Sequence, residues 1–467
     1  MLTSEAEVLG LSPDASSTKA AQGLKSPGKW PTLGSDEAAV WGECQGSGSK
    51  PYQTQVDLSG PSFKCSCPSR KFPCKHGLAL LLLRTAGQVA ASDTRPLWVS
   101  EWLDSRRDRA EKKEAKAAAV AAAPPDPEAS AKREAKRWSR VDGGLAELSL
   151  WMQDMLRQGL ASQQLDDAST HQAWRNMAAR LVDAQAPGMA ARVTQLYDVA
   201  SARGDWPAVL LSHLGQWQLL LDAAARRDQL PPAMLDDVMG ALGFNQDKAE
   251  LLATSPAVAD TWRVLGGCQI EGQGRLVERR MWLLGERTRR IALLQDYAHG
   301  GRGYERAWLV GRSYAASLHF YPGGAPMRAI AADASSLLDE QGDASPSLLA
   351  HSQAQRSWRD LAERLAGNPF QPLQPLMLQG VHLHRAEGAG WQAVVTDAAH
   401  EGTDGEQRVL QLDLPDEQAW SLLAASGGHP VLAMGEWSDE RWRLLSAWSL
   451  VGDDGAQLIW ALSGEVQ

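Results

Sequence analysis

The sequence predicts an α+β multidomain protein with three parts: a small module made of a hairpin and a helix, a helical bundle region, and a β-rich α+β region. The chain has 467 residues, 44% of them hydrophobic and 22% charged, which is enough for about two to four domains with separate cores. Its apolar residues alternate near the amino terminus, then recur every three or four residues, and alternate again beyond Cys268. These changes of period predict the three parts.

Residues 1–28 are rich in Ser, Ala, Gly and Pro and show little apolar periodicity, so we expect a mobile leader. They contain neither the basic region nor the apolar stretch of a secretory signal. The longest apolar runs are shorter than the roughly 20 residues that cross a bilayer. Five cysteines are too few for a disulfide framework in a chain of this length. We therefore expect a cytoplasmic protein that makes no membrane contact.

The next segment has the pattern of a β-hairpin followed by a helix. Residues 38–44 and 52–58 alternate apolar and polar side chains around a Gly/Ser-rich turn. A run of leucines at 78–84 predicts a short helix that is buried on most faces, and Gly87 is suited to end it.

Between the hairpin and this helix lies a cysteine cluster with the spacing Cys-x-Cys-x6-Cys-x-His. Cys65 and Cys67 are two residues apart, so on a strand their sulfur atoms would face the same side. Cys74 and His76 come just where the helix begins. Three thiols and one imidazole match the four tetrahedral ligands of a structural Zn²⁺, and they leave no open position for catalysis. The sequence predicts one structural zinc ion; the alternative is a chance cluster of free thiols.

Basic residues surround this motif, and no acidic residue lies between Ser59 and Arg84. The basic side chains nearest the ligands are Lys64, Arg70, Lys71 and Lys75. Zn²⁺ with three thiolates carries one negative charge, so these residues could simply compensate the metal site and be solvated. Alternatively, they form a basic face for phosphates or for an acidic partner.

The four ligand positions resemble the SWIM-type zinc finger, and we assign residues 29–105 to such a domain. Stretches near 177–190, 282–296 and 429–437 are similar to the long bacterial proteins that carry this finger at their amino end. The resemblance implies a ββα-like zinc module that binds DNA or proteins. It also implies an association with MoxR-type AAA+ ATPases and von Willebrand A-domain proteins, a setting that suggests assembly or chaperone work.

The rest of the chain divides into three predicted segments. Residues 106–137 mix opposite charges, alanines and a proline cluster, which indicates a solvated linker that is helical on both sides of the prolines. Residues 138–265 have helical periodicity interrupted by Pro187-Gly188, Pro207 and Pro231-Pro232, and form the predicted helical domain. Residues 266–467 form the predicted β-rich α+β domain. Its candidate strands are 290–296, 316–321, 380–385, 391–396, 408–414 and 431–434.

No other pattern supports catalysis. His382 and His384 share a strand face but lack a third ligand, and Cys44 and Cys268 are isolated, so each has the pattern of a small buried residue. The sequence offers neither a nucleophile elbow nor a phosphate-binding loop. We therefore expect a protein that is not an enzyme and acts as a protein-protein adaptor. The alternative is a DNA-binding protein that uses the basic face of the zinc module.

Overall fold

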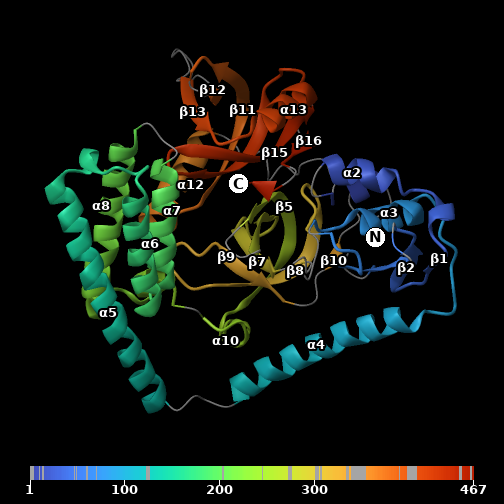
Figure 1. The fold of residues 1–467 in the computed structure, drawn as a ribbon, viewed down its shortest axis with the longest axis horizontal. Helices are drawn as coiled ribbons and strands as arrows, with labels where there is room; N and C mark the ends of the chain where they lie inside the picture. The colour runs from blue at the N-terminus through green and yellow to red at the C-terminus, as the bar shows by residue number, and fades with distance from the viewer. Residues whose placement is uncertain are drawn as a thin grey trace.

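The computed structural model places the amino-terminal module at one end of the molecule and a helical bundle at the other, with two further sheets between and above them (Figure 1). The structure describes residues 5–9, 11–12, 15–46, 48, 50–58, 62–69, 71–122, 127–201, 205–244, 246–271, 276–299, 304, 308–332, 336–337, 354–388, 390–396, 407–451, 455–462 and 465–466. Among the helices of these residues, none combines the length and the apolar character needed to span a membrane.

The amino-terminal module is a four-stranded antiparallel sheet with one helix on its face. The strands follow chain order and are β1 (Thr32–Ser35), β2 (Ala39–Cys44), β3 (Tyr52–Asp57) and β4 (Ser62–Cys65). Helix α3 (Lys75–Thr85) packs against β2, β3 and β4. The predicted hairpin of residues 38–44 and 52–58 is the β2–β3 pair, and Gly87 follows α3 with a left-handed φ of 69°.

The leader differs from the prediction. Residues 1–28 contain two short helices, α1 (Glu5–Leu9) and α2 (Ala15–Gln22), and both contact α3. Val8 and Ala21 have no exposed surface and belong to the same core as the leucines of α3. The physical reason is the composition of α3: residues 78–83 are all fully buried, so the side of the helix that the sheet leaves uncovered must be covered by another element.

Two long helices connect the module to the bundle. Helix α4 (Leu97–Ala122) runs beneath the molecule and contacts α10 (Lys248–Thr254), and helix α5 (Pro127–Gln158) continues into the bundle (Figure 1). The predicted linker, residues 106–137, therefore consists of the end of α4 and the start of α5. The prolines between them fall mostly outside the described residues.

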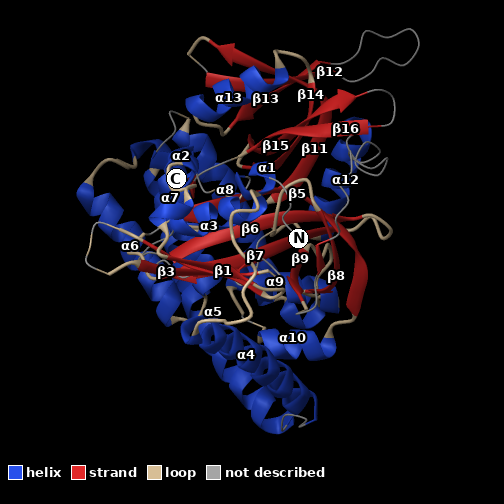
Figure 2. Ribbon diagram, turned by 90° about the vertical axis from the view of Figure 1, so that its right-hand side faces the viewer, coloured by secondary structure: helices blue, strands red, loops and turns tan. Residues whose placement is uncertain are grey.

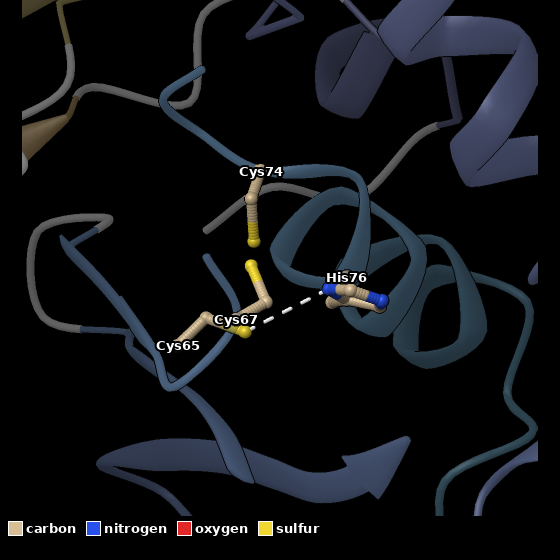
Figure 3. Close-up of side chains that lie close together, drawn as sticks. All are labelled: Cys65, Cys67, Cys74 and His76. Carbon is tan, nitrogen blue, oxygen red and sulfur yellow. Dashed lines mark hydrogen bonds between the residues drawn. The ribbon is translucent and has the colours of Figure 1, made fainter. Parts of the chain in front are cut away.

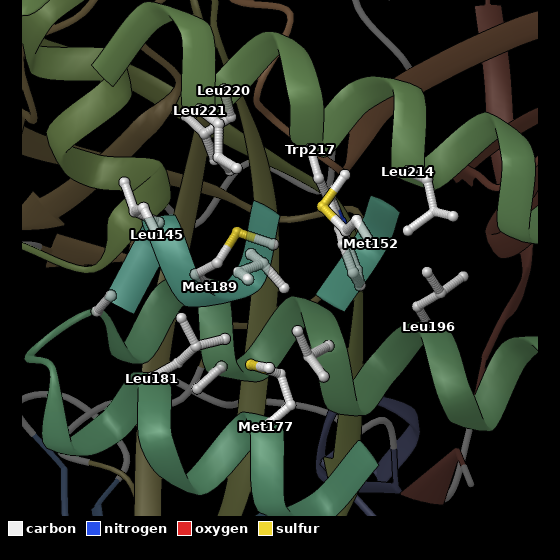
Figure 4. Packing of buried hydrophobic residues seen from close by; sticks show 14 of the residues in the cluster. Leu145, Met152, Met177, Leu181, Met189, Leu196, Leu214, Trp217, Leu220 and Leu221 are labelled. Atoms are coloured by element: carbon white, nitrogen blue, oxygen red, sulfur yellow. The ribbon is translucent and has the colours of Figure 1, made fainter. Parts of the chain in front are cut away.

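Five consecutive helices share the largest hydrophobic core. They are α5, α6 (Ala168–Asp183), α7 (Pro187–Ser201), α8 (Trp206–Ala225) and α9 (Pro232–Leu242). Residues from four of them interdigitate in Figure 4, among them Met152, Leu181, Leu196 and Trp217. The predicted breaks at Pro187 and Pro232 are helix starts, where proline loses no hydrogen bond.

The predicted boundary between the helical and β-rich domains at 265/266 falls inside a strand. Helix α10 ends at Thr254, and β5 runs from Ala257 to Glu271. Pro256 accounts for the early change, because proline cannot donate the next helical hydrogen bond and disfavours helical backbone in the residue before it. The expectation that residues 257–265 are helical is therefore wrong.

Two sheets form the rest of the structure (Figure 2). The first has the order β10-β8-β9-β7-β6-β5-β17, and the second the order β13-β12-β11-β14-β15-β16. Additional pairings of β8 with β5 and of β13 with β15 close each sheet on itself. The strands of the first sheet are β5, β6 (Leu276–Gly285), β7 (Ile291–His299), β8 (Ser313–Phe320), β9 (Arg328–Ala331), β10 (Ser336–Leu337) and β17 (Glu465–Val466).

The second sheet contains β11 (Gln374–Ala386), β12 (Gly390–Thr396), β13 (Gln407–Leu412), β14 (Val431–Ser438), β15 (Arg441–Val451) and β16 (Gly455–Ala461). Helix α12 (Ala354–Gly367) contacts β11, and α13 (Asp416–Ser426) contacts β16. The two sheets share a core to which Trp282 of the first and Trp448 of the second contribute. Each of the six predicted strands overlaps an observed one: β7, β8, β11, β12, β13 and β14.

Candidate metal centre

The four predicted ligands come together where β4, the following loop and the start of α3 meet. Cys65 is the last residue of β4, Cys67 lies in the loop, Cys74 is the residue before α3, and His76 is the second residue of that helix. Their ligand atoms all lie within 4.8 Å of one another, and Cys65 Sγ is 3.8 Å from His76 Nδ1. Figure 3 shows the three sulfur atoms and the imidazole turned toward one another.

This donor set fits one structural Zn²⁺. Zinc bonds of about 2.3 Å to sulfur and about 2.0 Å to nitrogen place the corners of a tetrahedron roughly 3.5 to 3.8 Å apart. The 3.8 Å separation of Cys65 Sγ and His76 Nδ1 matches that spacing. Cys74 and His76 are buried and the other two side chains are half-buried, so the site suits a coordinatively closed ion. The three thiolates and His76 would hold Zn²⁺, whose role there is to cross-link β4 to α3.

Neighbouring groups fix the orientation of the ligands. Thr54 is fully buried, and its hydroxyl oxygen lies 3.1 Å from Cys65 Sγ, because β3 and β4 pair with these two residues directly opposite each other. The backbone N–H of Gly77 donates to Cys74 Sγ at 3.5 Å. The ring of Tyr52 packs on the ring of His76 with a centroid distance of 5.0 Å. Such outer contacts hold metal ligands in their binding rotamers.

The thiols influence one another's protonation. The pKa of Cys67 is held well below its ordinary value, because the Cys65 and Cys74 thiols donate hydrogen bonds to its sulfur. The same hydrogen bonds among the three thiols raise the pKa of Cys65 to about 11 and also raise the pKa of Cys74. One thiolate is therefore stabilised in the absence of a metal, and forming the second and third is unfavourable. A divalent cation compensates this mutual repulsion.

The predicted basic residues do not gather equally around the centre. Lys64 on β4 and Lys75 at the start of α3 are exposed, and neither forms an ion pair with a described residue. Lys71 is exposed as well, and its Nζ donates to Ser16 Oγ of α2 at 3.0 Å. Arg70 lies outside the described residues. Lys29 was not predicted. Burial raises the pKa of the nearby Cys44 thiol, and the charges of Lys75 and Lys29 oppose this rise.

The loop between Cys67 and Cys74 contacts the first of the two large sheets. Phe72 packs against Phe63 of β4 and against Tyr304, with centroid distances of 5.7 and 6.4 Å. Leu309, which precedes β8, belongs to the core of the amino-terminal module. The metal centre therefore lies next to an internal interface of the protein.

The four donors were predictable from the sequence, whereas the residues that support them were not. Cys65 and Cys67 do not share a strand face, because β4 ends at Cys65 and the loop itself turns Cys67 inward. Thr54 was missed because its contact with Cys65 depends on the register of β3 with β4, and β4 was not predicted. Tyr52 was missed because its contact with His76 depends on how α3 packs against β3. Cys44 and Cys268 are buried, as expected. His382 and His384 join no group of candidate ligands among the described residues.

Comparison with protein-family models places two known domains in the chain. Residues 52–84 match the SWIM zinc finger, from the first residue of β3 to within one residue of the end of α3. Residues 136–242 match the SWIM-associated four-helix bundle domain, which ends with α9. The chain thus combines a SWIM zinc finger with its associated helical bundle, and the Cys/His cluster of the finger fits one structural zinc ion. A search of curated proteins and a search of solved structures returned no match.

Proposed function

We propose that this protein is a non-enzymatic adaptor, located in the cytoplasm, whose zinc finger and helical bundle bind protein partners. The observation that supports it most is the closed metal centre: four protein donors surround one point, so a zinc ion there has no free position for a substrate or an activated water. The metal would stabilise a small binding module.

Rigid attachment of this module supports an adaptor role. The leader helices cover α3, and Phe72 and Leu309 join the module to the first large sheet. The finger is therefore joined to the first large sheet by packed side chains as well as by the chain itself, which suits a protein that presents more than one binding surface. The partner class implied by the resemblance is a MoxR-type AAA+ ATPase or a von Willebrand A-domain protein.

DNA binding by the basic face of the finger is the alternative. Lys64 and Lys75 are exposed and favour it. However, Lys71 is engaged by Ser16, and the whole chain has a net charge of -9. Among the described residues of the predicted basic face, two lysines without an ion pair are a small electrostatic footprint for a polyanion, which is why we prefer protein partners.

The test is affinity copurification of the full-length protein from its native host, with partners identified by mass spectrometry. We expect wild type to retain a stable protein partner and Cys74→Ser to lose both zinc and that partner. Cys44→Ala is the matched control, because it removes a buried thiol of the same module that is not among the four donors. It should keep both.

The outcomes separate the two functions. Recovery of no stable protein partner by wild type would contradict the adaptor proposal. Recovery that depends on nucleic acid would favour the alternative, and the affinity for a DNA duplex should then fall with salt with a slope of about -0.9 per contacted phosphate. In that case Lys64→Gln and Lys75→Gln should each reduce the slope, whereas an adaptor should be insensitive to both.

A further inference from the structure

The structure contains a cleft between the helical bundle and the second large sheet. Its lining residues come from the part of the chain from Arg192 onward and include none of the four metal ligands. It has a volume of about 340 Å³ and is lined by α7, α8, the segment after α12 and the turn between β14 and β15. This volume is within the range of small-molecule sites. The bundle and the second sheet each contribute one wall, so neither part forms the cleft alone.

One face of α8 is turned toward the cleft. Val209, His213 and Trp217 follow one another at four-residue steps and all line it. His213 Nε2 lies 2.8 Å from Asp439 Oδ1, which joins α8 to the β14–β15 turn. Asp439 and Glu440 both have left-handed backbone, with φ of 51° and 61°. These two residues form the two-residue turn of the β14–β15 hairpin, for which such backbone is usual, and the His213 contact joins this turn to α8 at the rim of the cleft.

Arg192 is the cationic group of the cleft. Its Nη2 donates to the backbone carbonyl of Phe370, and among the described residues no carboxylate pairs with it. Burial lowers the pKa of its guanidinium, with no nearby acid to offset the effect. A guanidinium has five N–H donors, and only Nη2 of Arg192 donates a hydrogen bond to a described residue, so its other donors have no partner there. They are therefore available to an acceptor that enters the cleft.

The acidic groups of the cleft do not supply that acceptor. Asp439 is already paired with His213 and also accepts a hydrogen bond from Ser438. Asp205 has an interaction of its own. Glu440 is exposed at the rim, where water and salt screen its charge. The unmatched charge inside the cleft is that of Arg192.

The remaining lining combines apolar walls with amide groups. Phe370, Trp437 and Leu365 supply apolar surface, and Gln195, Gln216 and Gln371 add side-chain amides that make no hydrogen bond to a described residue. Amides pair well with the amides of a peptide backbone, and a guanidinium pairs in bidentate fashion with a carboxylate.

From this arrangement we infer that the cleft binds the carboxyl-terminal residue of a peptide chain, with its free carboxylate on Arg192 and an apolar side chain against Phe370 and Trp437. The inference rests on the proposed function to the extent that the peptide belongs to a protein partner. It makes no use of the zinc finger.

The test is a titration of the full-length protein with N-acetyl-phenylalanine, followed by ligand-observed NMR. N-acetyl-phenylalanine amide is the matched probe, because it has the same shape without the charge. Free phenylalanine, which has an ammonium group in place of the peptide amide, separates a peptide end from a free amino acid. We expect the first probe to bind about 10-fold to 100-fold more tightly than the amide, the usual effect of a hydrogen bond to a charged group, and more tightly than free phenylalanine.

Arg192→Gln should reduce binding of N-acetyl-phenylalanine to the level of its amide. Arg175→Gln, an exposed arginine on α6 that does not line the cleft, is the control and should change nothing. If Arg192→Gln fails to fold, Arg192→Lys keeps a charge without the bidentate fork and should give intermediate binding. Equal binding of the acid and the amide, no saturable binding of the acid, tighter binding of free phenylalanine, or full binding by Arg192→Gln would each overturn the inference. None of these results would bear on zinc content or on copurified partners.

Discussion

Phe72 meets Tyr304 edge-on, with 6.4 Å between the ring centroids and 78° between the ring planes. Phe72 belongs to the loop that separates the second and third thiols, whereas Tyr304 follows β7. The guanidinium of Arg279 on β6 lies over the ring of Tyr304, 4.1 Å from the ring centroid. Side-chain contacts through Tyr304 therefore connect the zinc finger to the first large sheet.

The first prediction concerns this contact. Phe72→Ala and Tyr304→Ala should each destabilise the protein, and the double variant should cost less than the sum of the two, because the second substitution finds the contact already gone. We expect a coupling of about 0.5 to 1.5 kcal/mol, the usual value for an aromatic pair. Urea denaturation of the two single variants and the double variant measures it. Strict additivity would mean that the rings do not stabilise each other.

The second prediction concerns Thr54, whose hydroxyl lies 3.1 Å from Cys65 Sγ. Thr54→Val keeps the shape of the side chain but removes this hydroxyl, so Cys65 loses a partner that orients its sulfur. We expect zinc affinity to fall about 10-fold to 100-fold, as for other contacts to a metal ligand. Competition with a chelator of known affinity measures the change.

Thr54→Ser is the control for this variant, since it retains the hydroxyl and loses only a methyl group. It should keep most of the affinity. An unchanged affinity in Thr54→Val would show that the hydroxyl does not support the metal centre.

The sequence predicted what depends on local spacing. The four donors could be found because Cys-x-Cys and Cys-x-His are close in the sequence, and the short loop between the two pairs is enough to bring them together. Strands β7, β8 and β11 to β14 could be found because their side chains alternate. By contrast, the second half of β6 contains Met281-Trp282-Leu283-Leu284, a run buried on both faces, which periodicity cannot distinguish from a helix.

What remained hidden depends on contacts between distant residues. Val8 and Ala21 are buried only because α3 needs cover, and the Ser and Gly around them gave no sign of it. Thr54 supports Cys65 through strand register, and Arg192 is paired with the carbonyl of Phe370, which lies 178 residues further along the chain. No local pattern encodes these relationships, since each follows from how finished elements pack.

The third prediction compares two helical glycines. A Cβ on Gly188 would lie 2.4 Å from the carbonyl oxygen of Ala241, so α7 and the end of α9 approach each other too closely for a side chain. Gly188→Ala should therefore destabilise the protein by about 1 to 3 kcal/mol. A Cβ on Gly215 of α8 would meet nothing within 4 Å, and Gly215→Ala should instead stabilise by about 0.5 to 1 kcal/mol. Denaturant midpoints measure both changes. An unchanged or raised stability in Gly188→Ala would contradict the close packing of α7 on α9, and a lowered stability in Gly215→Ala would contradict the open space beside α8.

The fourth prediction concerns Asp237, a buried residue of α9 that joins three parts of the fold. Its carboxylate accepts hydrogen bonds from Gly324 N–H at 2.9 Å and from Asn368 Nδ2 at 2.7 Å. Burial raises its pKa to about 6, although the bond from Gly324 acts in the opposite direction, and the charge of Asp236 raises the pKa further.

Because the pKa of Asp237 is higher in the folded state than in the unfolded state, the folded protein holds this proton more tightly. The stabilisation that the proton brings is complete below about pH 4 and is lost as the pH rises through about 6. Asp237→Asn cannot titrate, so the free energy of unfolding of wild type relative to Asp237→Asn should decrease between these two pH values and then stay constant. We expect a decrease of about 1 to 2 kcal/mol, allowing for screening by nearby solvent.

Urea unfolding of both proteins from pH 4 to 8 measures this difference, and Asp228→Asn provides the comparison for the loss of one exposed carboxylate on the same bundle. Asp237→Asn also replaces the carboxylate that accepts from the Gly324 N–H by an amide, which should lower the stability of this variant by a constant amount at every pH. That constant loss does not alter the slope, so the two effects can be separated. A difference that increases between pH 4 and 6 would mean that Asp237 is stabilised as the carboxylate, and its two hydrogen bonds would then outweigh the cost of its burial.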